Sequence, residues 1–274
     1  MEELRLGFVE SKFADIIWSH EPLPSRELVA LAKEELEWTK STTYTVLRND
    51  RIGILGENGA GKSTLLRTLA AYIKPLDGHV LYEGREVQTL SAQELAKKIS
   101  VVLTDTGPVA NMSVRELVSL GRIPYTNYLG TLTAKDKEAV ERAMEIMGIH
   151  TFADRYISTL SDGERQKCMI AKAFAQETAT ILLDEPTAFL DYPSKVQLLR
   201  TLKRLATEEN KAIIVSVHDL ELALRLADKI WLMNNGALTE GNVKSLSESG
   251  ALQNFIDDDS IVYNAQENRI EIRH

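Results

Sequence analysis

The spacing of hydrophobic positions changes once along this chain, at Asn49–Asp50. Before that point apolar residues recur at helical spacing, and the prolines of "EPLPS" interrupt them. We predict a helix over 4–18, a second helix capped by Ser25, and a third over 40–48. Beyond the change point, short apolar runs alternate with helical patterns, which is a different kind of domain.

Strands and helices alternate through the second region. Apolar runs typical of strands lie at 51–55, 99–103, 180–185, 212–218 and 229–233, and 78–84 reads as a strand and a turn. Helical patterns lie after the first run and at 91–98, 112–156, 161–176, 193–209 and 219–227, with breaks at Pro124 and Gly130. This alternation predicts an α/β fold with a parallel sheet and helices on both faces.

Composition narrows the classes of function. The net charge of −8 argues against broad binding to nucleic acid, which favours basic surfaces. No apolar run approaches the roughly 18 residues that cross a bilayer, so any membrane role is expected to be peripheral. The single cysteine, Cys168, cannot form an internal disulfide, and we expect it to be a buried apolar residue of a protein from a reducing cytoplasm.

A glycine-rich loop follows the first strand and opens a helix. The segment "GENGAGKST" matches the phosphate-binding pattern G-x-x-x-x-G-K-[ST]. Its residues are Gly56, Glu57, Asn58, Gly59, Ala60, Gly61, Lys62, Ser63 and Thr64. The glycines allow backbone N–H groups to surround phosphate oxygens, and the helix adds its positive end. Lys62 is expected to reach the β- and γ-phosphates, and Ser63 to bind Mg²⁺.

Two carboxylates end a buried strand further along. In "ILLDEP", Asp184 is expected to hold Mg²⁺ and Glu185 to polarise the attacking water. In the motif "LSDGERQ", Ser161 lies 23 residues before Asp184. Its Ser161 and Glu164 form a capping box, which by itself predicts only a well-capped helix.

Together these motifs resemble the ATP-binding cassette (ABC) ATPases from about Asp50 onward. "LSDGERQ" is similar to the family signature LSGGQ, with Asp162 and Glu164 as departures. "AFLD" resembles the D-loop that ends at Asp191, and His218 matches the switch histidine. The resemblance implies a P-loop NTPase fold over 49–274, with a RecA-like parallel core and a helical subdomain at about 105–157.

The resemblance also implies a mechanism that needs two copies of the chain. ATP and Mg²⁺ would bind between them, with Lys62 and the catalytic residues Glu185 and His218 from one copy. Ser161 and Gly163 would come from the other copy and present a helix N-terminus to the γ-phosphate. Thr104 stands where the family has its Q-loop glutamine, so we expect weak or water-mediated Mg²⁺ binding there, and coupling through this loop is open.

"LVSLGRIPYTNYLG" and "HDLELALRLADKIWLM" resemble the ATPases of importers for iron–siderophores, haem and cobalamin. That resemblance implies transmembrane permease subunits, an indirect partner in a substrate-binding protein, and a place on the cytoplasmic face of the bacterial cell membrane. It does not identify the cargo.

Residues 1–48 resemble another family, the penicillinase-repressor type of winged-helix regulator. The likeness is to its helix-turn-helix part, in which a helix such as 40–48 enters the DNA major groove. The segment carries six Lys/Arg and nine Asp/Glu, a net charge of −3, so we expect it not to bind DNA. It replaces the leading strands of an ABC ATPase, which leaves the strand of 78–84 with an expected unpaired edge. The window Leu28–Lys33, where the family has an aromatic residue for adenine, contains none.

Several alternatives stay open at this stage. The N-terminal piece fits a natural fusion, an error in a gene boundary or an artificial chimera. The chain could be a DNA-binding regulator joined to a weakly active cassette, or a cassette ATPase of repair or translation, although it has neither duplicated cassettes nor a nucleic-acid insertion. The missing aromatic also leaves room for a cassette that is inert.

Overall fold

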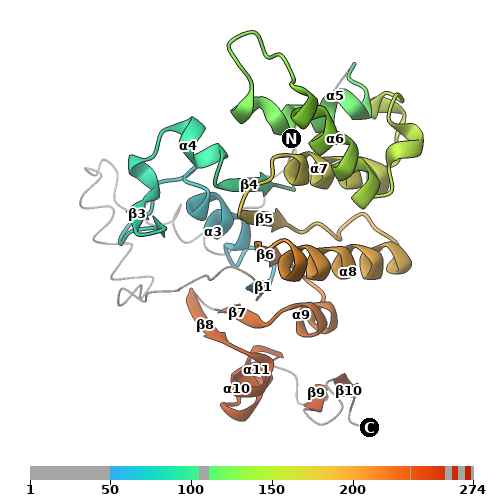
Figure 1. Cartoon of the computed structure of the whole chain (residues 1–274). Coiled ribbons are helices and arrows are strands. Elements are labelled where there is room, and N and C mark those ends of the chain that lie inside the picture. The colour runs from blue at the N-terminus through green and yellow to red at the C-terminus, as the bar shows by residue number, and fades with distance from the viewer. Residues whose placement is uncertain (1–49, 105–110, 235, 257–260, 265–268, 273–274) are drawn as a thin grey trace, which may run out of the picture.

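The structure is a computed structural model of the 274-residue chain, and it describes residues 50–104, 111–234, 236–256, 261–264 and 269–272. The predicted helices of 1–48 and the window for the adenine-stacking aromatic lie outside the described residues. Element labels follow Figure 1.

A six-stranded sheet forms the centre of the described chain, in the order β4-β5-β6-β1-β7-β8. All neighbouring pairs are parallel except β7 with β8, which are antiparallel. The parallel core was predicted, whereas the antiparallel edge strand was not. The strands of this sheet are β1 (Arg51–Gly56), β4 (Ile99–Val102), β5 (Thr180–Asp184), β6 (Ala212–Ser216), β7 (Lys229–Asn234) and β8 (Ala237–Gly241).

Two small hairpins lie outside this sheet. One pairs β2 (Leu81–Tyr82) with β3 (Arg85–Glu86), and the other pairs β9 (Ile261–Asn264) with β10 (Arg269–Ile272). The first hairpin occupies the predicted strand of 78–84. Leu81 on β2 is 61% exposed, so this short ribbon contributes little to the core.

Helices cover both faces of the sheet (Figure 1). They are α3 (Lys62–Leu69), α4 (Ala92–Ala96), α5 (Val114–Ser119), α6 (Ala134–Ile146), α7 (Asp162–Ala175), α8 (Tyr192–Glu208), α9 (Leu220–Leu226), α10 (Val243–Glu248) and α11 (Ala251–Ile256), with short 3-10 turns at η1 (Val87–Thr89), η2 (Leu120–Tyr125), η3 (His150–Phe152) and η4 (Ile157–Thr159). None of the helices in the described ranges has the length and hydrophobicity of a transmembrane span.

The sheet separates two apolar layers, because alternate residues of a strand point to opposite faces. Ile52 and Ile54 of β1 join Leu66 of α3 in one layer. Leu55 of β1 and Leu183 of β5 belong to the other layer, with residues of α7, α8 and α9. The central strands therefore have both faces buried, as expected for parallel strands.

The range predicted to hold a helical subdomain contains α5, η2 and α6, and these pack against α7 (Figure 1). Capping boxes begin α5 at Ser113 and α6 at Thr133. Val140, Ala143 and Met144 form the buried side of α6, as its helical spacing predicts. Residues 105–110 lie outside the described chain, so the start of the proposed subdomain stays a prediction.

A buried ion network joins these helices. The side chain of Arg122 is 3% exposed, and its Nε donates to Asp136 Oδ1 at 2.9 Å. Its Nη1 donates to the carbonyl oxygen of Ala175 and to Glu177 Oε2, at 2.7 and 2.8 Å. The hydroxyl and N–H of Thr133, together with Arg122, hold the pKa of Asp136 below its ordinary value. One guanidinium thus connects η2, α6 and the end of α7.

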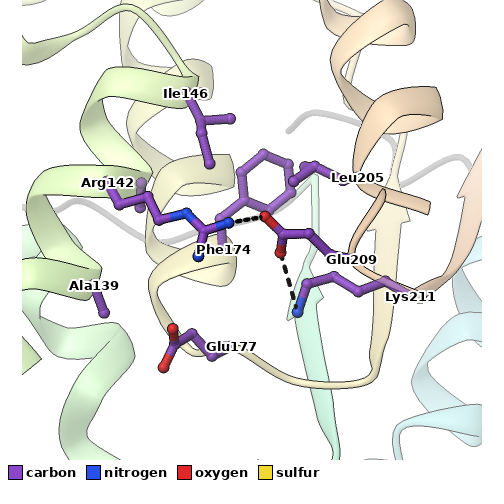
Figure 2. A pocket seen from close by; sticks show the side chains of 9 residues that line it. Ala139, Arg142, Ile146, Phe174, Glu177, Leu205, Glu209 and Lys211 are labelled. Carbon is purple, nitrogen blue, oxygen red and sulfur yellow. Dashed lines mark hydrogen bonds and ion pairs between the residues drawn. The ribbon is translucent and has the colours of Figure 1, made fainter. Parts of the chain in front are cut away.

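A small hollow lies beside this network, between α6 and the segment that follows α8 (Figure 2). Arg142 of α6 pairs with Glu209 at 2.5 Å, and Glu209 lies 3.8 Å from Lys211. The Nζ of Lys211 also donates to the carbonyl oxygen of Thr178 at 2.8 Å. The charged groups that line the hollow therefore have partners on the protein itself.

Arg122→Met should lower the free energy of unfolding by about 3–5 kcal/mol, because it leaves the buried carboxylate of Asp136 uncompensated. Arg142→Met is the matched control: its side chain is 58% exposed, and we expect a loss below about 1 kcal/mol. Urea unfolding of both variants measures the difference. Equal losses would show that the Arg122 network does not stabilise the fold more than a surface pair does.

Cys168 on α7 is fully buried, and burial raises the pKa of its thiol to about 12. Because the thiolate is the reactive form, we expect no reaction of the native protein with a disulfide reagent such as DTNB at pH 8, and complete reaction after unfolding in guanidinium. The absorbance of the released thiolate chromophore measures the extent of reaction in both states. Stoichiometric labelling of the native chain would contradict the burial.

Candidate functional site

The loop between β1 and α3 adopts backbone conformations that suit glycine. Gly59 and Gly61 have φ values of 82° and 94°, in the left-handed region. A side chain at Gly56 would be crowded, since a Cβ atom there would lie 3.0 Å from the Cβ of Ala60 and 3.0 Å from the carbonyl oxygen of Met233. The middle of the loop is exposed. Its backbone is therefore accessible to an anion, as the glycine pattern predicts.

Lys62 begins α3 and turns its side chain back into the loop. Its Nζ donates to the carbonyl oxygens of Gly56 and Glu57, at 2.7 and 3.0 Å. Burial lowers the pKa of Lys62, while the negative charges of Glu185 and Asp184 act in the opposite direction. The ammonium therefore lies inside the loop and close to both carboxylates, where phosphate oxygens could replace the carbonyl groups as its partners.

The two acidic residues lie at the carboxyl end of β5. Asp184 is 1% exposed, and its Oδ1 accepts a hydrogen bond from the Ser216 hydroxyl at 2.6 Å. Glu185 follows it with a φ of 48°, an uncommon conformation for a residue with a side chain. Its carboxylate contacts the imidazole of His218, whose Nε2 lies 2.5 Å from Oε1. The predicted base and the predicted switch residue are therefore in direct contact.

Thr104 lies beside the same acidic pair. Its hydroxyl donates to the backbone carbonyl oxygen of Asp184 at 3.2 Å. This contact links the segment after β4 to the end of β5. The role of Thr104 as a metal ligand stays a prediction, since the hydroxyl is engaged with the main chain.

The oxygen donors near the loop suit a hard cation. Ser63 lies in the first turn of α3, where it is partly buried, and Asp184 supplies a carboxylate. Mg²⁺ usually takes one or two such protein ligands and completes its shell with water and phosphate oxygens. Across the described ranges, no cluster of three or more His, Cys, Asp or Glu side chains could hold a metal. Ser63 and Asp184 therefore stay the candidate ligands that this structure offers.

The signature segment caps α7 as the sequence predicts. Ser161 is the N-cap residue of α7. Its hydroxyl donates to Glu164 Oε2 at 2.9 Å, and the N–H of Glu164 donates to the hydroxyl oxygen of Ser161. The N–H and hydroxyl of Ser161 hold the pKa of Glu164 below its ordinary value. The glutamate that replaces the family glutamine is thus an ionised part of the cap.

Gly163 lies against the D-loop of the same chain. A Cβ atom at Gly163 would lie 3.1 Å from the carbonyl oxygen of Phe189 and 3.5 Å from Leu190. Asp191 ends the D-loop and caps α8, where its Oδ1 accepts the Ser194 N–H at 3.1 Å. Glycine at 163 therefore allows the start of α7 to pack against the D-loop.

The predicted site residues form two groups. Lys62, Thr104, Asp184, Glu185 and His218 gather where β1, β4, β5 and β6 end, the edge at which parallel sheets usually bind ligands. The second group, at the starts of α7 and α8, comprises Ser161, Gly163 and Asp191. Over the described part of the chain, no side-chain hydrogen bond or ion pair joins the two groups.

Ser216 is the residue that the sequence interpretation missed. It is completely buried and contacts both acidic residues through one hydroxyl. The segment "AIIVS" of β6 reads as an apolar strand, in which a serine passes as a small core residue. The available signal was its position, because a lone polar residue at the carboxyl end of a buried strand lies at the ligand edge of the sheet.

Two family models match the chain. The model described as "ABC transporter" matches residues 39–188, and the model described as "Penicillinase repressor" matches residues 6–65. The second match covers the segment for which the sequence indicated a helix-turn-helix resemblance.

Curated relatives include ATP-binding proteins of several transport systems. The uncharacterized ABC transporter ATP-binding protein MJ0873 of Methanocaldococcus jannaschii is 45% identical over 69% of this chain, and the match spans 65% of that protein, just under two thirds. The probable siderophore transport system ATP-binding protein YusV of Bacillus subtilis is 36% identical, with 84% of each chain covered. The ferric enterobactin transport ATP-binding protein FepC of Escherichia coli is 39% identical, over 71% of this chain and 75% of that protein.

Solved structures with the same fold include a metal-chelate type ABC transporter in an inward-facing conformation, with a TM-score of 0.70, 25% identity, and coverage of 84% of this chain and 88% of that one. The dimeric structure of the ABC transporter cassette MJ0796 has a TM-score of 0.67 and 25% identity, with 74% of this chain and 90% of that chain covered. The P-loop α/β fold predicted from the sequence is therefore confirmed.

Lys62→Ala should weaken nucleoside triphosphate binding by about 10- to 100-fold, the effect of losing charge-assisted hydrogen bonds to phosphate. The wild-type affinity should fall as the pH rises toward 10.5, since burial lowers the pKa of Lys62 and the protonated form binds phosphate. This alkaline decline should be absent in Lys62→Ala. Titration with a fluorescent triphosphate analogue measures both effects.

Lys98→Ala is the control, because Lys98 pairs with Glu83 at the opposite end of β4. Unchanged affinity in Lys62→Ala, or an equal loss in Lys98→Ala, would remove Lys62 from the phosphate site.

Proposed function

The chain belongs to the ABC transporter family, and we propose that it is the ATP-hydrolysing nucleotide-binding subunit of a membrane importer for iron–siderophore, haem or cobalamin-type chelates. One observation carries the enzymatic part of the proposal. The carboxyl edge of one sheet brings together the glycine-rich loop with Lys62, the buried Asp184, and Glu185 in contact with His218.

Each residue of this group has a role in ATP hydrolysis. Lys62 exchanges its contacts with the loop carbonyl groups for contacts with the β- and γ-phosphates. Glu185 orients the attacking water and polarises it, so that the water oxygen bonds to the γ-phosphorus as the bond to the ADP oxygen breaks. His218 turns from Glu185 to the γ-phosphate, which frees the carboxylate for the water. The oxygens of Ser63 and Asp184 hold Mg²⁺, which neutralises phosphate charge when it is bound.

A second copy of the chain completes each site. Within one copy, the group at the starts of α7 and α8 has no side-chain bond to the phosphate group in the described chain, and Ser161 and Gly163 stand at a positive helix end. We place this end against the γ-phosphate held by the partner copy, with Asp191 beside it. The dimeric cassette MJ0796, with the same fold, supports this arrangement. ATP then favours the closed pair, and hydrolysis removes the charge that joins the copies.

The names of the relatives support a proposal for the cargo class and the location. YusV, FepC and the cobalamin import protein BtuD of Halobacterium salinarum, the last 40% identical over 46% of its own length, carry siderophore, enterobactin and cobalamin in their names. We propose that this chain binds transmembrane permease subunits, that a substrate-binding protein delivers the chelate, and that the chain works on the cytoplasmic face of the cell membrane.

A second candidate function rests on the match of residues 6–65 to the penicillinase repressor. In it, the N-terminal piece is a regulator fragment fused to a weakly active cassette. The net charge of −3 over the first 48 residues does not favour DNA binding, so the transport function is preferred. Salt-dependent, sequence-selective DNA binding by the full chain would reverse this preference.

Glu185→Gln should lower the ATPase rate by at least about 100-fold, because an amide cannot polarise the water as the carboxylate does. ATP affinity should stay within about threefold, because Lys62 and the loop are unchanged. Phosphate release and ATP titration of the full chain measure the two quantities. Glu86→Gln, at an exposed hairpin, is the matched control and should leave both unchanged. Normal turnover in Glu185→Gln would remove the assigned base.

Crosslinking tests the two-copy site. Asn58→Cys in the exposed loop and Asp162→Cys at the start of α7 are made in separate chains that also carry Glu185→Gln. The two variants should crosslink to each other through a short bismaleimide only when ATP and Mg²⁺ are present. Asn58→Cys mixed with Tyr128→Cys, a fully exposed position in the loop before α6, should not crosslink. ATP-independent yields, or none, would exclude this arrangement of the copies.

A further inference from the structure

We propose that Ser216 is a positioning residue for hydrolysis, and that its single hydroxyl fixes both the metal-binding carboxylate and the backbone of the catalytic base. The inference deepens the proposed function and rests on it for the roles of Asp184 and Glu185. The contacts of Ser216 themselves are features of the structure.

The hydroxyl of Ser216 forms one hydrogen bond as a donor and one as an acceptor, with Asp184 and Glu185 respectively. It donates to Asp184 Oδ1 at 2.6 Å and accepts the N–H of Glu185 at 2.9 Å. A serine hydroxyl has only one hydrogen, so donating to the carboxylate leaves it an acceptor toward the amide. Complete burial keeps water from competing for either bond. The hydroxyl therefore has one orientation that satisfies both neighbours.

Strand register brings the three groups together. Ser216 is the last residue of β6 and lies directly opposite Asp184, the last residue of β5. Neighbouring strands are about 4.8 Å apart, within reach of a short side chain. The remaining β6 residues are Ala212, Ile213, Ile214 and Val215, so the strand carries a polar side chain only where it meets the acidic pair.

The amide contact explains how Glu185 keeps its backbone conformation. A φ of 48° is sterically unfavourable for glutamate and persists only where surrounding contacts hold it. The bond from the Glu185 N–H to Ser216 is such a contact, and the contact with His218 holds the same residue from its side chain. Without the serine oxygen, the backbone after β5 is no longer held in this conformation. The Glu185 carboxylate, which must orient the attacking water, is then no longer held in position either.

The carboxylate contact sets the rotamer of Asp184. Its Oδ1 is bonded to the serine, so the second oxygen of the carboxylate is the one left to face a cation. Alanine at 216 would leave a buried carboxylate oxygen without its donor, and the carboxylate would turn to find another. We therefore expect cation affinity and the turnover rate to fall together.

The closing experiment compares Ser216→Ala and Ser216→Thr with Ser100→Ala. Ser100 is a matched control, because it is a buried serine of β4, on the other side of β5, with its oxygen 3.0 Å from the hydroxyl of Thr178. We expect Ser216→Ala to lower kcat by about 10- to 100-fold with KM for ATP within about threefold, as for the loss of an outer-shell contact. Ser216→Thr keeps a hydroxyl and should recover much of the rate. Ser100→Ala should change neither constant.

Two further readouts do not require turnover. In the nucleotide-free chain, hydrogen exchange of the Glu185 amide should accelerate by about tenfold or more in Ser216→Ala and stay slow in Ser100→Ala. In Glu185→Gln chains with ATP, Mn²⁺ affinity followed by electron paramagnetic resonance should fall by about tenfold when Ser216→Ala is added.

The proposal is overturned if Ser216→Ala and Ser100→Ala lower the melting temperature alike while kcat, amide exchange and Mn²⁺ affinity stay unchanged. It is equally overturned if the wild-type Glu185 amide exchanges freely. A wild-type chain without ATPase activity would instead remove the proposed function, and the exchange and Mn²⁺ measurements would still decide the role of Ser216.

Discussion

A carboxylate buried at the end of β5 sets the constraint on which the rest of the site depends. An ionised group that is 1% exposed needs partners, and Asp184 finds them in the Ser216 hydroxyl and in the nearby ammonium of Lys62. The lysine is itself drawn into the loop by the carbonyl groups of Gly56 and Glu57. The loop between β1 and α3 and the acidic residues at the end of β5 therefore attract each other electrostatically even before a nucleotide binds.

Sheet topology supplies the geometry for this unit. The strands β1, β5 and β6 are adjacent and parallel, so the loop after β1 and the residues that end β5 and β6 meet at one edge. The turn η2 and the helix α6 are fixed separately, through the Arg122 network that ties them to the end of α7. The ligand edge of the sheet and the helical group therefore have separate polar anchors.

Much of this arrangement could be predicted from the sequence, and particular residues show where prediction stopped. The apolar runs predict the parallel strands, and the capping box of Ser161 and Glu164 predicts the start of α7, because both signals are local in the sequence. The edge strand β8 was missed, since its five residues are mostly exposed and carry no apolar alternation. Ser216 and the buried Arg122 were missed for another reason: their partners lie far away in the chain, and only the fold brings them together.

The left-handed backbone at Glu185 has a consequence for the evolution and engineering of this protein. Such a conformation in a glutamate costs on the order of 1–3 kcal/mol, which the rest of the fold must offset. Glycine or asparagine would relax it, so the substitutions that stabilise this position most readily are the ones that discard the carboxylate. Thermal selection alone would therefore remove the proposed catalytic base, and only a screen that also demands turnover would keep the acid in place.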